Sequence, residues 1–246
     1  MTIFHQTIWI ARHGNRLDFV HPEWFNTAAR RYDPPLSDDG ELQAQQLADR
    51  LRTEPIRQIV ASPFRRCVQT AYAVAELLDL PIQLEWGICE WLNADWMTNM
   101  PETASIAELQ AEFPRIDPAY RSIMRPSYPE TEPDCLARSG QTARTIADQF
   151  AVNQAVNQVK ADASSDLLFV GHGATVHGMI WGLQETRDPV KAPLCCLTRI
   201  DRDLRLDHSV PSATTQLTTQ LAATARLTLT CDTSHLSPTR EPFRLN

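Results

Sequence analysis

Residues 7–14 read TIWIARHG, an apolar run that ends abruptly in arginine, histidine and glycine. Residues 166–173 repeat this pattern as DLLFVGHG. A short apolar run that stops at a polar, glycine-containing turn is typical of a buried parallel strand. Ligands of open α/β sheets bind beyond the carboxyl ends of the strands. The sequence therefore predicts that His13 and His172 lie at the ligand-binding edge of one sheet.

Strand-like and helical segments alternate along the chain. Strands are expected over residues 7–11, 58–61, 82–84 and 166–170, followed by two antiparallel strands at 194–200 and 226–229. Helices are expected over residues 38–51, 63–78, 106–113, 134–156 and 174–183; Ser37 opens the first, with Leu42, Leu47 and Leu51 on its apolar face, and Ser62 is the N-cap of the second. This order predicts an α/β fold, a three-layer sandwich with a mainly parallel central sheet.

Residues 93–133 differ from the rest because six prolines interrupt them. Only the short helix at 106–113 is expected there. Long irregular insertions in compact folds usually have functional roles. We therefore expect a single domain over residues 1–246 with an inserted helical cap, or lid, at about residues 93–133. The stretch 207–224 yields no structural expectation.

The chain has 246 residues, of which 43% are hydrophobic and 22% are charged. This composition excludes collagen, coiled-coil and disordered chains. The formal net charge of -7 disfavours general binding to nucleic acids or to anionic membranes, and neither is expected as a partner. No leader pattern begins the sequence, and no run of about 18 apolar residues occurs, so a cytoplasmic protein is expected.

The six cysteines show no CxxC pair and no regular spacing. In a chain of this size they are expected to be buried free thiols rather than a disulfide framework. No HExxH, paired-cysteine or Walker A pattern occurs. Neither a metal nor a cofactor is therefore expected.

Four arginines fall near the predicted strand ends, namely Arg12, Arg16, Arg65 and Arg66. Guanidinium groups match phosphate oxygens and gather where planar, bidentate recognition is needed. Two imidazoles beside them supply a nucleophile for phosphorus and a donor for its oxygens. Together these residue types predict a site for an anionic, phosphorylated ligand.

Three motifs carry a resemblance to a known family. Arg12-His13-Gly14 after a strand resembles the signature of the histidine phosphatase superfamily, also called phosphoglycerate-mutase-like. Residues 62–70, SPFRRCVQT, resemble its second motif, SPxxRxxQT, and Gly171-His172-Gly173 resembles its late histidine. The three occur in the family's order between residues 7 and 183. RHGNRLDF, SPFRRCVQTA and GICEW further resemble the phosphatase domain of the Sts/TULA signalling proteins.

The resemblance implies a role for each of these residues. His13 would be the nucleophile that becomes phosphohistidine, and Glu90 the general acid that later activates water. The phosphoryl group would be bound by Arg12, Arg16, Arg66 and His172. The activity would be that of a metal-independent phosphomonoesterase acting on a phosphorylated small molecule or a phosphoprotein. The sequence gives no indication of the oligomeric state.

The identity of the acid remains open. The rivals of Glu90 are Asp18, Glu85, Asp95 and Glu102. The residues around Glu90 in sequence, such as Ile88 and Trp91, are apolar. Since desolvation favours the neutral form of a carboxyl group, we expect Glu90 to be protonated.

Two arginines and the reaction itself also allow more than one interpretation. Arg16 is either a phosphate ligand or an ion-pair partner of Asp18, and Arg65 is expected to point to solvent or to cap a helix. A phosphoglycerate-type mutase and a non-catalytic domain that binds a phospho-ligand are the competing functions. Family mutases carry an ERxYG-like segment in the insertion, and residues 95–133 contain none.

Overall fold

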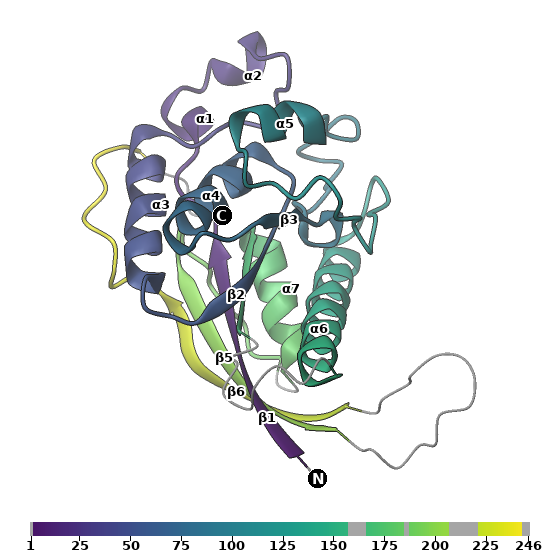
Figure 1. Cartoon of the computed structure of the whole chain (residues 1–246). Coiled ribbons are helices and arrows are strands. Elements are labelled where there is room, and N and C mark those ends of the chain that lie inside the picture. The colour runs from purple at the N-terminus through teal and green to yellow at the C-terminus, as the bar shows by residue number, and fades with distance from the viewer. Residues whose placement is uncertain (1, 157–165, 185–186, 207–220, 243–246) are drawn as a thin grey trace.

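Six strands form one mixed sheet in the computed structural model, which describes residues 2–156, 166–184, 187–206 and 221–242 (Figure 1). The strand order is β3-β2-β4-β1-β5-β6. The bounds are β1 Thr2–Arg12, β2 Ile56–Ala61, β3 Ile82–Leu84, β4 Asp166–Gly171, β5 Leu197–Leu206 and β6 Leu221–Asp232. The first four strands of this order are parallel, and β5 and β6 are antiparallel to their neighbours. The predicted α/β class and mainly parallel sheet are confirmed.

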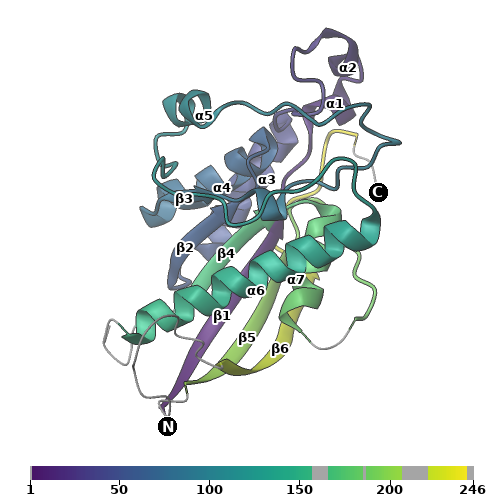
Figure 2. The same ribbon diagram turned by 90° about the vertical axis from the view of Figure 1, so that its right-hand side faces the viewer.

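Helices cover both faces of the sheet and complete the predicted three layers (Figure 2). On one face lie α3 (Asp38–Leu51) and α4 (Arg65–Leu78), and on the other α6 (Glu132–Val156) and α7 (Gly173–Leu183). Successive side chains of a strand point to opposite faces. Trp9 therefore packs in the core under α3 and α4, whereas Ile8 and Ile10 pack in the core under α6 and α7.

The shorter helices lie beyond the carboxyl end of β1 (Figure 1). They are α1 (Leu17–Val20), α2 (Trp24–Thr27), the 3-10 helix η1 (Trp86–Ile88) and α5 (Ile106–Glu112). This end of the sheet carries both histidine motifs. The described helices include none that is long and apolar enough to cross a membrane.

Two local predictions were wrong. Ser62 is not a helix cap, because α4 begins at Arg65 with Phe64 as its N-cap, and the Ser62 hydroxyl bonds a distant side chain instead. Leu42 is 40% exposed, because the buried face of α3 is turned toward Gln43 and Leu47. Ser37 does cap α3, since its hydroxyl accepts a hydrogen bond from the Gly40 amide at 3.2 Å.

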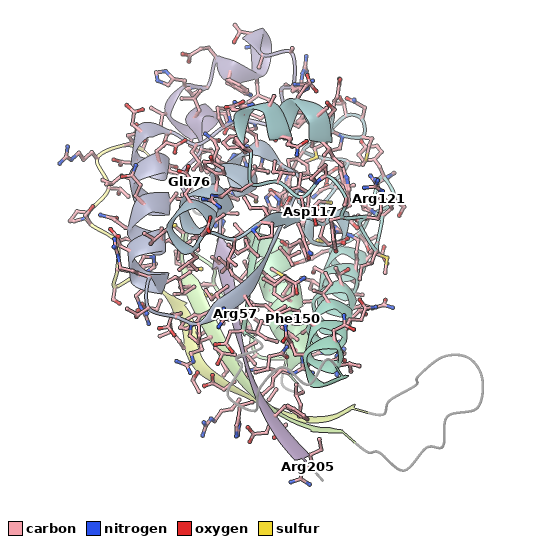
Figure 3. All side chains as sticks on the ribbon, in the orientation of Figure 1. Arg57, Glu76, Asp117, Arg121, Phe150 and Arg205 are labelled. Carbon is pink, nitrogen blue, oxygen red and sulfur yellow. The ribbon has the colours of Figure 1, made fainter. Side chains whose placement is uncertain are left out.

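The segment 93–133 contains α5 and otherwise irregular chain. Its inner edge joins the sheet, because Ile82 of β3 exchanges backbone hydrogen bonds with Arg115 and Asp117 (Figure 3). Its outer part is tied to the loop before α3, where Arg30 pairs with Glu108 at 2.8 Å. The segment is thus attached both to the start of β3 and to the loop before α3.

All six cysteines have free thiols; five of them are buried, and Cys231 is half-buried. Of the stretch 207–224 left open by the sequence, residues 207–220 lie outside the described residues.

A close contact between α6 and α7 generates the first prediction. A Cβ atom on Gly182 would lie 2.2 Å from the Gly140 Cα, inside any permitted contact. Gly182→Ala must therefore separate the helices and is expected to lower the free energy of unfolding by about 1–3 kcal/mol. The measurement is urea denaturation, with the exposed α6 substitution Gln141→Ala as the control. Equal stability of both variants would show that the helices do not depend on this contact.

Candidate active site

Three strand ends converge at one edge of the sheet, as the motifs predict. β1 and β4 pair in parallel with Arg12 opposite Gly171, so the next residues, His13 and His172, emerge side by side. Their ring centroids are 5.3 Å apart. Ser62 follows β2, and its amide donates to the Val170 carbonyl at 3.0 Å, which brings it to the same edge.

His13 is held as a neutral imidazole with a defined tautomer. Its Nδ1 lies 2.7 Å from the Gly14 carbonyl oxygen. Because a carbonyl only accepts, Nδ1 carries the hydrogen and Nε2 keeps its lone pair. Burial and the nearby positive charge of Arg66 lower the pKa of His13 well below 6.5. The ring is therefore unprotonated at neutral pH.

His172 is completely buried and bonded through both ring nitrogens. Its Nε2 is 2.8 Å from the Ser62 hydroxyl, and its Nδ1 is 3.2 Å from Arg66 Nη2. Since a guanidinium only donates, Nδ1 of the neutral ring accepts and Nε2–H donates to Ser62. Burial lowers the pKa of His172 to about 4, although Glu90 opposes the shift.

Arg12 and Arg66 are buried guanidinium groups with spare donors. Arg12 Nη1 donates to the Ala192 carbonyl at 2.7 Å, and Arg66 Nη2 donates to Glu90 at 3.0 Å. The Nε atom of each arginine is buried with no hydrogen-bond partner among the described residues. A buried unpaired donor is costly, and guanidinium donors match phosphate oxygens. An anion bound here would satisfy both groups.

Arg16 forms the ion pair that the sequence left open. Its Nε and Nη2 donate to the two oxygens of Asp18 at 2.9 and 2.7 Å. The Nη1 atom of Arg16 takes no part in this pair, whereas both carboxylate oxygens of Asp18 accept hydrogen bonds in it. Arg16 still belongs to the electrostatics of the site, because its charge contributes to lowering the pKa of both His13 and Glu90.

Of the carboxylates predicted as candidates for the general acid, Glu90 is the one that lies beside Arg66 and His172. Its Oε2 lies 3.0 Å from Arg66 Nη2 and 3.3 Å from His172 Nδ1, and its side chain is 12% exposed. Burial alone would raise the pKa of Glu90, but His172, Arg66 and Arg16 together hold it well below 4.5. The expectation that Glu90 is protonated is therefore wrong for the free site, since its chain neighbours are apolar but its neighbours in space include the charged guanidinium groups of Arg66 and Arg16.

The rival carboxylates are placed elsewhere. Glu85 is buried, but it accepts hydrogen bonds from the Ser122 and Tyr120 hydroxyls and from the Gly87 amide. Asp95 and Glu102 are exposed on the segment 93–133. Among the five candidates, Glu90 alone contacts His172 and Arg66, whereas Asp18 contacts Arg16.

Aromatic and hydroxyl groups that the sequence analysis did not assign complete the surroundings. The Phe64 ring packs edge-on against His172 at 5.2 Å, and Trp86 packs against Phe64 at 6.4 Å. Thr70 Oγ1 accepts from the Gly14 amide at 3.2 Å and so supports the turn after His13. Phe64, Thr70 and Ser62 all belong to the SPFRRCVQT motif, so this motif is the sequence feature that could have identified them as parts of the site.

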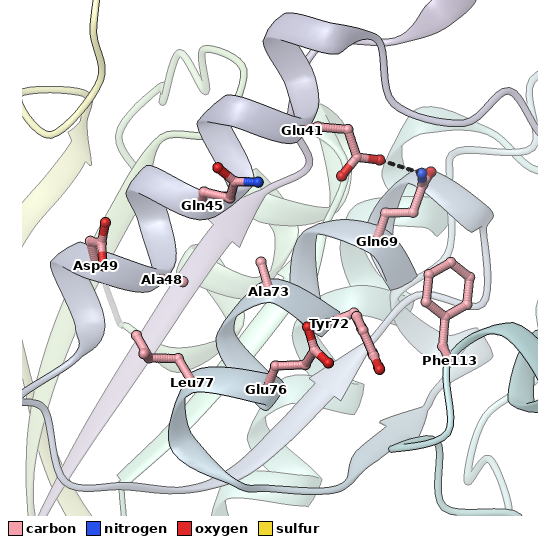
Figure 4. Close-up of a pocket in the computed structure, with 10 residues that line it drawn as sticks. All are labelled: Glu41, Gln45, Ala48, Asp49, Gln69, Tyr72, Ala73, Glu76, Leu77 and Phe113. Carbon is pink, nitrogen blue, oxygen red and sulfur yellow. Dashed lines mark hydrogen bonds between the residues drawn. The ribbon is translucent and has the colours of Figure 1, made fainter.

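Arg65 lies outside this cluster, as expected. Its guanidinium pairs with Glu112 of α5 at the surface. A hollow of about 550 Å³ between α3 and α4 also lies apart from the cluster (Figure 4). It is lined by Gln69, Tyr72 and Phe113 among others and by none of the predicted site residues. Gln69 has a structural role there, because its Oε1 accepts from the Leu36 amide and its Nε2 donates to Glu41.

The donor atoms of His13, Glu90 and His172 lie within 4.8 Å of one another. Two imidazoles and a carboxylate are also a zinc ligand set. Here Arg66 donates to Glu90 and His172, so a guanidinium already interacts with the atoms that a cation would need. The arrangement favours an anion.

Comparison with known proteins agrees with the motifs. The chain is 36% identical over 115 residues to the transcription factor tau 55 kDa subunit of Saccharomyces cerevisiae, covering 45% of this chain and 26% of that protein. It is 28% identical over 215 residues to the human ubiquitin-associated and SH3 domain-containing protein A, a Sts/TULA protein, covering 71% of this chain and 30% of that protein. The chain thus spans about a third or less of the length of these relatives.

A solved structure supports the fold. The ecdysone phosphate phosphatase of the silkworm, in complex with tungstate, superimposes with a TM-score of 0.62 at 20% identity, covering 86% of this chain and 97% of that one. A family model for the histidine phosphatase superfamily (branch 1) matches residues 8–205, which include all three motifs. The chain therefore belongs to the histidine phosphatase superfamily.

Proposed function

We propose that this chain is a phosphatase that hydrolyses phosphomonoesters through a phosphohistidine on His13, without a metal ion. The observation that carries the proposal is the tautomer of His13, whose Nδ1–H bonds the Gly14 carbonyl and leaves the Nε2 lone pair available near the buried guanidinium groups of Arg12 and Arg66. Membership of the family and the phosphatases among its relatives support the same conclusion. The substrate class is a phosphorylated small molecule or a phosphoprotein.

The first step transfers the phosphoryl group to His13. Arg12 and Arg66 bind the phosphate oxygens through donors that include their unpaired Nε–H groups, and Arg16 adds to the positive field, whereas His172 is a neutral neighbour. The Nε2 lone pair forms the N–P bond while the ester P–O bond breaks. Phosphoryl transfer is catalysed mainly by positioning and by neutralising charge on the equatorial oxygens, which these groups do.

Glu90 supplies the proton for the leaving alkoxide. In the free site the surrounding cations keep Glu90 ionised. A bound phosphate dianion offsets these cations and raises the pKa of Glu90, so the carboxyl group is able to hold a proton in the complex. After the alcohol leaves, the carboxylate accepts a proton from the water that attacks phosphohistidine. The alcohol and inorganic phosphate are the products.

The segment 93–133 acts in this proposal as the cap over the pocket. Met97 and Tyr128 of this segment pack in one apolar cluster with Tyr32 and Phe64. Phe64 in turn contacts His172. These contacts support the proposal that the segment shapes the part of the site that receives the leaving group.

His13→Ala is expected to lower kcat for p-nitrophenyl phosphate by at least about 10³-fold, because the nucleophile is lost. The assay is run in EDTA, which is expected to leave wild-type turnover unchanged. The control is His5→Ala at an exposed position of β1. A strict need for a divalent ion contradicts the proposal, and an inactive but folded wild type favours a phospho-ligand binding domain.

Glu90→Gln is expected to slow hydrolysis of an alkyl phosphate by about 10²–10⁴-fold, because its leaving group needs a proton. Release of p-nitrophenol needs little protonation and should fall much less. The matched control is Glu102→Gln, at an exposed carboxylate of the cap. Equal losses on the two substrates would remove Glu90 from the acid role.

The histidine pKa values predict a pH dependence. The pKa of His13 lies well below 6.5 and that of His172 is about 4, so both rings are neutral at pH 7 and His172 stays neutral as the pH falls to 5. The unfolded chain binds protons first, and folding stability therefore falls as the pH drops below about 6.5. Proton NMR titration of the two ring signals, assigned with His13→Gln and His172→Gln, measures the pKa values of the two histidines in the folded protein. A titration midpoint at pH 6.5 or above for either ring would contradict the prediction.

A further inference from the structure

The loop that carries Glu90 has little regular structure of its own. It begins with η1, and residues 89–92 then form neither a helix nor a strand. Buried backbone carbonyls in such a loop need donors from elsewhere, because neither a ladder nor a helix supplies them. One side chain of α6, that of Arg138, reaches four carbonyl oxygens of this loop.

The Arg138 guanidinium spans the loop. Its Nη1 donates to the Gly87 carbonyl at 2.9 Å and to the Trp86 carbonyl at 3.2 Å. Its Nη2 donates, at 3.4 Å, to the carbonyl oxygens of Cys89 and Glu90, which belong to the two peptide groups on either side of the Glu90 Cα. A guanidinium presents five N–H donors in one rigid plane, so it fixes these carbonyls relative to one another.

Glu130 holds the guanidinium in place and also bonds the loop. The side chains of Arg138 and Glu130 form an ion pair and are only 7% and 2% exposed. Arg138 Nε donates to Glu130 Oε2 at 2.9 Å, and Arg138 Nη2 donates to Glu130 Oε1. The same Oε1 accepts from the Leu92 amide at 3.1 Å. The buried pair therefore connects α6 to both ends of the loop.

The loop is also fixed on its other side. The Gly87 amide donates to Oε1 of the buried Glu85 at 2.7 Å. A Cβ atom on Gly87 would lie 2.3 Å from Thr142 Oγ1, so the loop packs directly against α6. A buried ion pair seldom stabilises a fold more than apolar residues of the same volume, because both charges lose their hydration. The contacts of Arg138 are therefore better explained by the geometry of the loop than by stability.

We propose that Arg138 is a positioning residue for Glu90. It fixes the backbone from which the Glu90 carboxylate reaches the site, where Oε2 lies 3.0 Å from Arg66 and 3.3 Å from His172. Because Glu130 offsets its charge, Arg138 acts through the loop and not on the substrate. A catalytic group displaced by about 1 Å can lose about 10²-fold in rate. This kinetic consequence rests on the proposed function, in which Glu90 is the acid.

The kinetic test is Arg138→Lys, which keeps the charge but loses the planar fork of donors. It is expected to lower kcat for butyl phosphate by about 10–100-fold. Release of p-nitrophenol needs little protonation, so kcat for p-nitrophenyl phosphate is expected to fall less than about threefold. The matched control is Arg202→Lys, at another buried arginine that pairs with an α6 residue, Asp148, and it is expected to change neither rate.

A double-mutant cycle separates positioning from a general loss of structure. In the Glu90→Gln background, Arg138→Lys is expected to lower kcat for butyl phosphate no further, because its effect passes through the Glu90 carboxylate. Equal losses on the two substrates, an undiminished loss in the Glu90→Gln background, or no loss at all would overturn the proposal. If Arg138→Lys does not fold, Glu130→Gln replaces it, since it weakens the same bonds and is expected to give the same substrate dependence.

Amide hydrogen exchange tests the loop without turnover. Arg138→Lys is expected to speed exchange in the peptide over residues 86–92, because the loop opens more often, whereas Arg202→Lys is not. Unchanged exchange there refutes the proposal. Faster exchange together with equal losses for Glu90→Gln on the two substrates contradicts the acid role of Glu90 in the proposed function, but it supports the hold of Arg138 on the loop.

Discussion

The register of β1 against β4 is the constraint on which the site depends. Arg12 lies opposite Gly171 in a parallel pair, so the residues that follow both strands meet at one edge. A slip by one residue would turn the side chains of either strand to the other face. Ile8 and Ile10 would then leave the core under α6 and α7. Core packing therefore fixes the 5.3 Å approach of His13 and His172.

This edge concentrates positive charge in a protein whose formal net charge is -7. Arg12 and Arg66 are buried there, and Glu90 is the carboxylate that contacts the cluster. Buried charges are costly unless paired, and the unpaired Nε atoms show that the pairing is incomplete. In the proposed function, a bound phosphoryl dianion supplies the missing partner. The positive charge of Arg66 and Arg16 lowers the pKa of both His13 and Glu90. In the proposed function, substrate binding offsets this charge and allows Glu90 to hold a proton.

Much of the fold and the convergence of the motifs could be predicted from the sequence, because strand periodicity and helix signals are local. The failures concern contacts between distant segments. Ser62 has the features of a helix cap, but its hydroxyl bonds His172, which is 110 residues away. The ionisation of Glu90 depends on Arg66 and Arg16, which come from distant parts of the chain, and Leu42 is exposed because the rotation of α3 depends on packing against the sheet.

The measurement that tests the central claim most directly is chemical trapping of the intermediate. The protein is mixed with substrate, quenched in base within one turnover and digested for tandem mass spectrometry. The account predicts a phosphoryl group on the peptide that carries His13, attached to its imidazole, stable in base and lost in acid. A phosphoryl group on His172 or on a cysteine, or steady turnover with no phosphorylated peptide, would contradict it.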